Sequence, residues 1–278
     1  MTFVPLYRRA LLETARTPWN TDGGSDYTVT VHRPWNVKMG RKEKKLPQNQ
    51  GICLKNHPEY WPAKKHGDYT SGQQVVDDLV SEDTLERIYE SLGDREPLIV
   101  APSLTKNDPS NVIPIWFAYN LGYHLDLNVC SDIFQRDVAH RTGRGGFYRL
   151  VNEPEFYGTV LPGQDYLIVD DVATMGGTLA SLRNHIEQNG GNVIGLSVLA
   201  DSNPRRYVDK TVPVEDFRLD ISQETLEGLR HKHGRCLEGF WEDQKGYGLE
   251  CLTEREGQFL LFFPNFRNIR RAFLEEKD

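Results

Sequence analysis

The chain has 278 residues, of which 38% are hydrophobic and 26% charged, and its formal net charge is −7. This composition excludes a disordered chain and the collagen and coiled-coil classes, and the length suits one large domain or a core domain with an extension. The acidic total also argues against a protein whose main role is to coat nucleic acid. Residues 1–96 carry 14 of the 33 basic and 14 of the 40 acidic residues, so the whole net charge lies in residues 97–278.

No apolar stretch approaches the roughly 18 residues that a membrane span needs. The positive charges near the start of the chain follow a short apolar stretch instead of preceding it, which is the reverse of a secretory signal. We therefore expect no contact with a membrane and a cytoplasmic protein.

The 4 cysteines include no C-x-x-C pair, which predicts reduced thiols and neither a disulfide framework nor a four-cysteine zinc site. A zinc site formed by His231, His233, Cys236 and Cys251 is the less favoured alternative. Zinc motifs usually pair their ligands at both ends, and this spacing does not.

Residues 1–80 are rich in Pro, Gly and Trp and are predicted to be irregular. The segment from Lys38 to Lys45 concentrates five positive charges, and Lys64, Lys65 and His66 follow it. A solvated loop is the simplest interpretation, and contact with a phosphate group or with nucleic acid is the alternative. One helix is predicted to follow, from the candidate N-cap Ser81 to Gly93. We expect residues 1–96 to form an N-terminal extension.

Strands alternate with helices in the middle of the chain. Apolar runs predict strands at 98–101, 125–129, 166–171 and 193–200, and helical periodicity predicts helices at 111–121 and 178–189. Parallel strands joined by helical crossovers form a sheet that is covered on both faces. The sequence therefore predicts an α/β fold with a parallel-sheet core in residues 97–201.

Two helix starts mark residues 202–278. Ser222 can cap a helix that runs to about Arg230, and Thr253 with Glu256 forms a capping box before an apolar run that Pro264 ends. We expect this part to be a helical extension, or a hood that covers the core.

The segment with the most chemical information is Leu167-Ile-Val-Asp-Asp-Val-Ala-Thr-Met-Gly-Gly-Thr-Leu. Its strand ends at the carboxyl edge of the sheet, where open α/β proteins bind ligands. Two ionised carboxylates at that edge can accept hydrogen bonds from vicinal sugar hydroxyls. Gly176 and Gly177 let backbone N–H groups approach an anion, and the positive end of the following helix points to the same place. The pattern indicates a ribose-phosphate site.

The run from Asp170 to Thr178 resembles the phosphoribosyl-pyrophosphate (PRPP) motif of type I phosphoribosyltransferases. Its Gly-Gly-Thr ending is similar to the adenine phosphoribosyltransferase version. The resemblance covers roughly residues 97–201. It implies a type I phosphoribosyltransferase-like core with N- and C-terminal elaborations, and a homodimer is usual for that fold.

The resemblance also implies roles for individual residues. Asp170 and Asp171 would hold the ribose hydroxyls, and residues 174–178 would surround the 5'-phosphate. The implied PRPP-binding set is Asp170, Asp171, Ala173, Thr174, Met175, Gly176, Gly177 and Thr178. Ala173 and Met175 depart from the family pattern, which has a larger aliphatic residue and a Ser or Thr at these positions. The missing hydroxyl at position 175 should weaken phosphate binding about ten- to a hundredfold without abolishing it.

Two further segments match family elements by position. The loop 101–108 occupies the place of the pyrophosphate loop, with Ser103, Thr105 and Lys106 as candidate ligands of pyrophosphate. Residues 131–158 occupy the place of a mobile arm, where Arg136, Arg141 and Arg144 could neutralise departing pyrophosphate. A polar capping loop and a solvated arginine loop are the respective alternatives.

These observations predict a Mg²⁺-dependent transferase that moves 5-phosphoribosyl from PRPP to a nitrogen of a nucleobase-like acceptor and releases pyrophosphate. The expected catalytic residues are Asp170, Asp171, Arg141 and Arg144, with no direct protein ligand to the metal. The alternative is a PRPP-sensing regulatory protein of the same fold, with an unusual acceptor as a third reading. Trp35, Trp61 or Trp241 could stack on a base, although a core or surface role is commoner.

Overall fold

The computed structural model describes residues 15–20, 27–35, 53–102, 111–136, 143–202 and 215–277. Its centre is a five-stranded sheet with the order β2-β5-β6-β1-β7. The strands are β1 (Thr28–Pro34), β2 (Leu98–Val100), β5 (Asp165–Ala173), β6 (Asn192–Asp201) and β7 (Phe217–Arg218). All neighbours pair in parallel except β1 and β7. The predicted α/β fold with a mostly parallel sheet is therefore confirmed.

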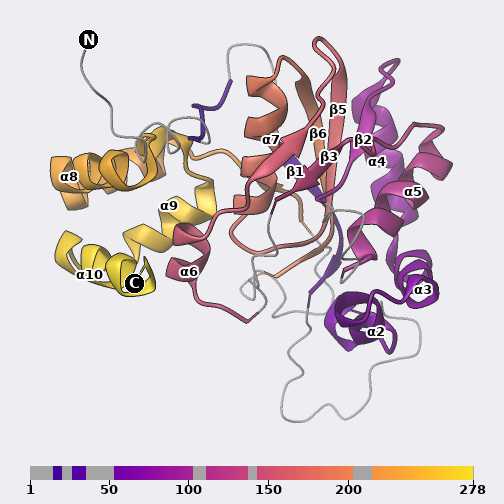
Figure 1. The fold of residues 1–278 in the computed structure, drawn as a ribbon, viewed down its shortest axis with the longest axis horizontal. Helices are drawn as coiled ribbons and strands as arrows, with labels where there is room; N and C mark the ends of the chain where they lie inside the picture. The colour runs from indigo at the N-terminus through magenta and orange to yellow at the C-terminus, as the bar shows by residue number, and fades with distance from the viewer. Residues whose placement is uncertain are drawn as a thin grey trace.

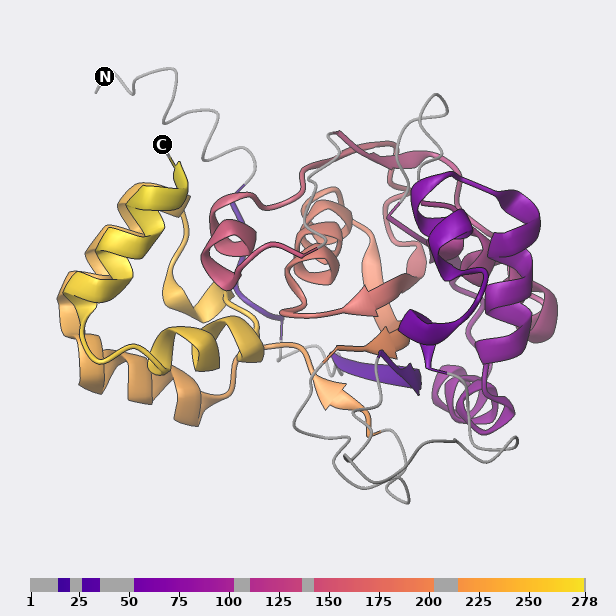
Figure 2. The same cartoon turned by 90° about the horizontal axis from the view of Figure 1, so that it is seen from below.

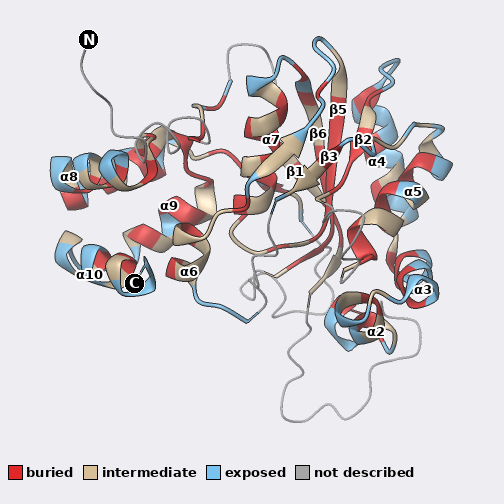
Figure 3. Ribbon diagram, in the orientation of Figure 1, coloured by how far each residue is buried: buried red, intermediate tan, exposed pale blue. Residues whose placement is uncertain are grey.

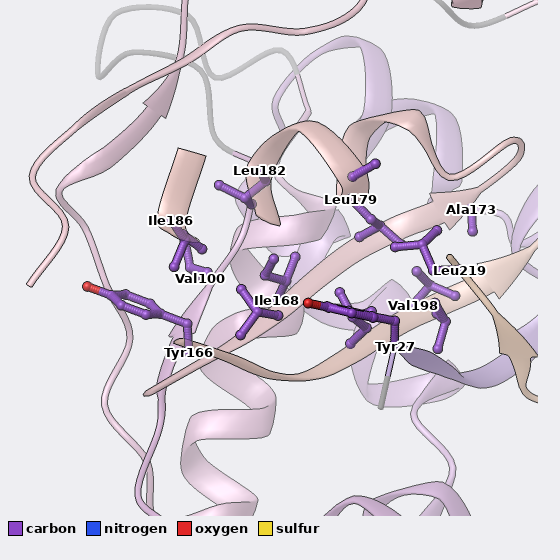
Figure 4. Packing of buried hydrophobic residues seen from close by; sticks show 14 of the residues in the cluster. Tyr27, Val100, Tyr166, Ile168, Ala173, Leu179, Leu182, Ile186, Val198 and Leu219 are labelled. Atoms are coloured by element: carbon purple, nitrogen blue, oxygen red, sulfur yellow. The ribbon is translucent and has the colours of Figure 1, made fainter. Parts of the chain in front are cut away.

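Helices cover both faces of this sheet (Figure 1). One face carries α2 (Tyr60–Lys65), α3 (Tyr69–Leu79), α4 (Glu82–Leu92) and α5 (Ile113–Leu125), preceded by the short 3₁₀ helix η1 (Leu54–Asn56). The other face carries α7 (Gly177–Gln188). Figure 4 shows Leu179, Leu182 and Ile186 of α7 near Ile168 and Val198 of the sheet, all of them buried. The helix spacing of the three α7 residues explains why one side of α7 is apolar.

A third apolar cluster lies outside the sheet. It joins α6 (Gly146–Val151) to α8 (Gln223–Lys245), η2 (Leu249–Cys251), α9 (Glu254–Leu261) and α10 (Phe266–Lys277). Seen from below, these C-terminal helices form a group beside α7, on the side away from α2 to α5 (Figure 2). Trp241 is fully buried at the centre of the group, and the red stripes on its helices in Figure 3 mark the same cluster. We call residues 219–277 the C-terminal unit.

The N-terminal part of the chain differs from its prediction. Residues 1–80 were expected to be irregular, yet β1 lies inside the main sheet and α2 and α3 pack on it. The Thr-Val-Thr-Val run at 28–31 consists of β-branched residues, which favour a strand, and polar Thr alternates in it with apolar Val. The two valines, Val29 and Val31, are buried. The main sheet thus extends beyond residues 97–201.

Smaller differences concern element ends. The strand expected at 125–129 is reduced to a parallel bridge between Ile99 and Val129, because α5 continues through Gly122 to Leu125 and stops at Asp126, whose φ is 55°. The helix that Ser222 caps ends at Gly234, whose φ of 63° and ψ of −165° are not helical, about one turn beyond the predicted end near Arg230, and a second helix then runs to Lys245 under the same label. The helix after Ser81 and the capping box of Thr253 and Glu256 are confirmed. No helix in the described ranges is both long and apolar enough to span a membrane.

Candidate functional site

The acid pair lies where β5 extends past its neighbour. β2 ends at Val100, which pairs with Ile168, whereas β5 continues alongside β6 to Ala173. Asp170 and Asp171 therefore lie beyond the end of β2, at the carboxyl edge of the sheet. Such an edge, in the centre of a parallel sheet, is where α/β proteins bind ligands.

The two acids start from opposite faces of the sheet, because adjacent residues of a strand point to opposite sides, yet their carboxyl groups interact with each other at the end of β5. Asp171 has the parity of Leu167 and Val169, which pack with α2 to α5. Asp170 has the parity of Ile168, which packs with α7. Both acids are buried, with 7% exposure for Asp170 and 4% for Asp171. Their surroundings differ for this reason.

Asp171 is held by two side chains from the helical face. Lys64 of α2 forms an ion pair with its Oδ2 atom, and the Nδ2 atom of Asn111 donates to the same oxygen at 3.1 Å. Burial disfavours ionisation of Asp171, but the positive charge of Lys64 and these hydrogen bonds outweigh burial, so its pKa is lowered. Asp171 is an ionised carboxylate with a counter-ion in place.

Asp170 has no such support. Its Oδ1 atom accepts a hydrogen bond from the backbone N–H of Asp171 at 2.8 Å. Burial and the negative charge of Asp171 raise the pKa of Asp170 well above its ordinary value, despite the opposing effect of Lys64. The pair thus combines one carboxyl group that favours the protonated form with one that is charged, an arrangement found where buried carboxyls share a site.

The glycine-rich loop follows directly after β5 and leads into α7. Gly176 is the N-cap of α7 with a φ of 82°, in the left-handed region that glycine adopts without strain. Ala173, Gly176 and Gly177 are buried, and Thr178 lies in the first turn of the helix. The predicted strand, loop and helix start are all present, and the first N–H groups of α7 lie at the end of β5.

The loop is also contacted from the C-terminal unit. The Thr253 hydroxyl donates to the carbonyl of Met175 at 2.6 Å, and Arg255 donates to the carbonyl of Thr174 at 3.1 Å. Arg255 also makes two hydrogen bonds with the buried carboxylate of Asp201, at 2.6 and 2.8 Å. Met175 itself packs against the apolar cluster of the C-terminal unit.

The residues predicted to bind pyrophosphate are only partly described. Ser103, Thr105, Lys106 and Arg141 lie outside the described residues. The predicted arm begins and ends in a small antiparallel sheet of β3 (Ile133–Gln135) and β4 (Phe156–Gly158), with α6 between the two strands.

Two of the three arginines that were predicted to neutralise pyrophosphate lie in the described residues. Arg136 pairs with Glu155 at 3.1 Å, and exposed Arg144 lies over the ring of Tyr148 at 4.9 Å. Within the described part of the chain, neither arginine contacts the acid pair.

Several candidates from the sequence lie elsewhere. Trp241 is fully buried in the C-terminal unit, Trp35 packs on Tyr60, and Trp61 is 45% exposed. The described residues, which include the four zinc candidates His231, His233, Cys236 and Cys251, contain no group of three or more His, Cys, Asp or Glu side chains suited to a metal. Cys251 is buried whereas Cys236 is exposed.

Sequence reasoning missed Lys64, Asn111, Thr253 and Arg255 as parts of this site. Lys64 was recognised only as one member of a basic cluster, and Thr253 only as a helix cap. Lys64 is 107 residues from Asp171, and Thr253 is 78 residues from Met175. Contacts at such separations leave no local signal in a single sequence.

Comparison with known proteins agrees with the motif. The chain is 30% identical over 127 residues to an orotate phosphoribosyltransferase of Coccidioides immitis, covering 37% of this chain and 50% of that protein. It is 46% identical over 44 residues to an orotate phosphoribosyltransferase of Methanosphaera stadtmanae, covering 16% of this chain and 25% of that protein. The chain is similar to type I phosphoribosyltransferases.

A longer match covers most of this chain. The chain is 37% identical over 246 residues to the protein TraN of Escherichia coli, which covers 88% of this chain and 51% of TraN. The chain thus spans about half the length of TraN. The crystal structure of adenine phosphoribosyltransferase from Saccharomyces cerevisiae aligns with 74% of this chain and 96% of its own at 14% identity and a TM-score of 0.32. No protein-family model matches the chain.

Proposed function

We propose that this chain binds PRPP and transfers its phosphoribosyl group to a nitrogen of a nucleobase-like acceptor. The observation that supports this most is the acid pair at the open end of β5, followed without interruption by the glycine-rich loop and the N-terminus of α7. The ribose of PRPP would then lie over Asp170 and Asp171, and its 5'-phosphate would lie over residues 174–178.

The reaction asks the protein mainly for binding and charge stabilisation. The lone pair of the acceptor nitrogen forms a bond to C1 of the ribose, the C1–O bond breaks, and pyrophosphate leaves with that electron pair while the nitrogen loses its proton to solvent. Positive charge develops on the ribose ring in the transition state, and the ionised Asp171 would stabilise it at short range. Residues 174–178 would keep the 5'-phosphate fixed while C1 moves.

Magnesium fits this site as a cation carried by the ligand. Mg²⁺ keeps several waters and is usually bound by one or two carboxylates together with substrate phosphates. The sequence predicts no direct protein ligand to the metal, so the negative charge of the acid pair would act on a Mg²⁺ that the diphosphate of PRPP carries, and the ion pair of Lys64 with Asp171 supports a cation near this carboxylate. The bound Mg²⁺ would neutralise the charge that builds up on departing pyrophosphate.

A PRPP-sensing protein is the second candidate, and the Lys64–Asp171 ion pair favours it. Lys64 and Asn111 both contact the Oδ2 atom of Asp171, which a ribose hydroxyl would use. Ligand binding that displaces Lys64 would be coupled to a change at α2, which is what a sensor requires. The apolar Met175 also provides less phosphate binding than a hydroxyl would.

Pyrophosphate release tests the first candidate. The chain would be incubated with PRPP, Mg²⁺ and a pool of purine and pyrimidine bases, next to a base-free control. Base-dependent release that disappears in Asp171→Asn and persists in Asp165→Asn, at the other end of the same strand, is expected for a transferase. Calorimetric binding of PRPP without release under any base would assign the sensor. No binding of PRPP would refute both.

A further inference from the structure

The loop between β5 and α7 is held on one side by residues far away in the chain. The carbonyls of Thr174 and Met175 accept hydrogen bonds from Arg255 and Thr253, and the carbonyl of Gly177 accepts one from Arg16 at 3.4 Å. Arg16 is itself bound to buried Glu256 at 2.7 Å. The carbonyls of two loop residues and of the first residue of α7 are therefore anchored near the start of α9.

The direction of the carbonyls fixes the direction of the amides. In a trans peptide the C=O of one residue and the N–H of the next lie in one plane and point in opposite directions. Anchoring the carbonyls of residues 174, 175 and 177 on the C-terminal unit therefore points the N–H groups of residues 175, 176 and 178 away from it. These are amides that the proposed function assigns to the 5'-phosphate.

The same contacts account for the unusual Met175. A Ser or Thr at this position would offer a hydroxyl to the ligand, whereas the Met175 side chain packs on the apolar cluster of the C-terminal unit. Gly176 lies so close to the unit that an added Cβ would be 2.4 Å from Leu219 Cδ1 and 3.4 Å from Thr253 Cγ2. The loop before α7 is thus in close contact with the C-terminal unit, and under the proposed function its backbone would form the ligand-binding surface.

We propose that Thr253 and Arg255 are positioning residues, which hold the backbone of residues 174–178 in its anion-binding conformation. The C-terminal unit is then a working part of the ligand site. This inference rests on the proposed function, since it takes the loop to bind the 5'-phosphate. Thr253 is 1% exposed and Asp201, which orients Arg255, is 0% exposed, so both supports are rigid.

Thr253 permits a test with matched controls. Thr253→Ala removes the hydrogen bond to Met175, and it also removes the cap of α9, in which Thr253 accepts from the Glu256 N–H at 3.1 Å. Ser222→Ala removes the corresponding cap of α8, where Ser222 accepts from Thr225, without touching the loop. Thr253→Ser keeps both interactions. Thr253→Ala should lose more thermal stability than Ser222→Ala, because it removes one hydrogen bond in addition to a cap, and Thr253→Ser should lose little.

The expected result separates positioning from stability. PRPP affinity, measured by calorimetry with Mg²⁺, should fall about threefold to tenfold in Thr253→Ala, the range of one lost hydrogen bond, and stay unchanged in Ser222→Ala and Thr253→Ser. Unchanged affinity in Thr253→Ala, or an equal loss in Ser222→Ala, would overturn the inference.

A second measurement needs no ligand. The chain has only 3 methionines, so the labelled methyl signal of Met175 can be assigned with Met175→Leu. That signal should shift in Thr253→Ala and not in Ser222→Ala. If the wild type does not bind PRPP, the proposed function fails, and the Met175 signal alone then decides whether Thr253 holds the loop.

Discussion

Replacing Lys64 by Met should loosen the ligand-free site and tighten its binding of PRPP. The Lys64 ammonium contacts Oδ2 of Asp171, and a ribose hydroxyl that donates to this same oxygen would displace it. Met has a similar length and no charge, so the variant leaves the oxygen available while α2 keeps its packing. Lys65, the exposed neighbour on the same helix, provides the matched control Lys65→Met.

The size of the effect follows from the burial of the pair. The side chains of Lys64 and Asp171 are 16% and 6% exposed, so their hydrogen bond is charge-assisted and poorly screened. Such a bond contributes about 1.5–3 kcal/mol. If PRPP breaks it completely, the variant should bind PRPP about ten- to a hundredfold more tightly.

The same variant should lose stability when no ligand is present. Breaking a buried ion pair costs about 3–5 kcal/mol, and the lower value applies here because Lys64 reaches solvent. That loss corresponds to a fall in Tm of about 6–12 °C for a chain of this size. Titration calorimetry with PRPP and Mg²⁺, and scanning calorimetry without them, would measure both effects on wild type, Lys64→Met and Lys65→Met.

Weaker binding in Lys64→Met would refute this reasoning, because it would mean that Lys64 contacts the ligand instead of competing with it. An unchanged Tm would refute the ion pair itself. Lys65→Met should behave as wild type in both measurements, so an equal effect there would show that the change reflects net charge alone.

The other predictions concern the acid pair and the loop. Asp170→Asn should raise the Tm at pH 7. Because folding raises the pKa of Asp170, this carboxyl contributes fully to stability only below its pKa in the unfolded chain, about 3.9, and the contribution is lost as the pH rises through its pKa in the folded chain. Asp171→Asn should lower the Tm at pH 7, because a lowered pKa stabilises the fold above the unfolded value, and the difference from wild type should shrink below about pH 4. Thermal scans at pH 3 and pH 7 test both, and the same Tm change at both values would contradict them. Gly176→Ala should cost about 1–3 kcal/mol because φ is 82° there, measured by urea unfolding against Gly239→Ala, which lies in open space inside α8.

Local patterns predicted the centre of the molecule well. The strand at 166–171, the helix after Gly177 and the capping box of Thr253 depend on neighbours within a few residues, so one sequence contains their whole signal. β1 also has a local signal in its alternating Thr and Val residues, which the surrounding Pro, Gly and Trp residues obscured. The end of α5 was missed because tertiary packing lets a helix continue through Gly122, whereas the helix end predicted near Arg230 lies within about one turn of the break at Gly234.

The side chains that complete the site could not be predicted in this way. Lys64 and Asp171 meet only because α2, held by α3, lies over the carboxyl end of β5. Arg255 and Thr174 are 81 residues apart and meet only because the start of α9 lies against the loop that precedes α7. The motif identifies the strand and loop, whereas the supporting residues depend on how the two ends of the chain fold back onto the core.

The two ends act on different parts of the proposed ligand. From the N-terminal side, Lys64 contacts the Asp171 oxygen that we expect the ribose to use, and this contact would break when PRPP binds. From the C-terminal side, Thr253 and Arg255 hold backbone carbonyls that no ligand uses, so these contacts persist. PRPP binding should therefore move the Lys64 side chain and leave Thr253 and Arg255 in place. A transferase needs only this side chain to move, whereas in a sensor its release would also let α2 move, so the position of α2 in the PRPP-bound chain distinguishes the two functions.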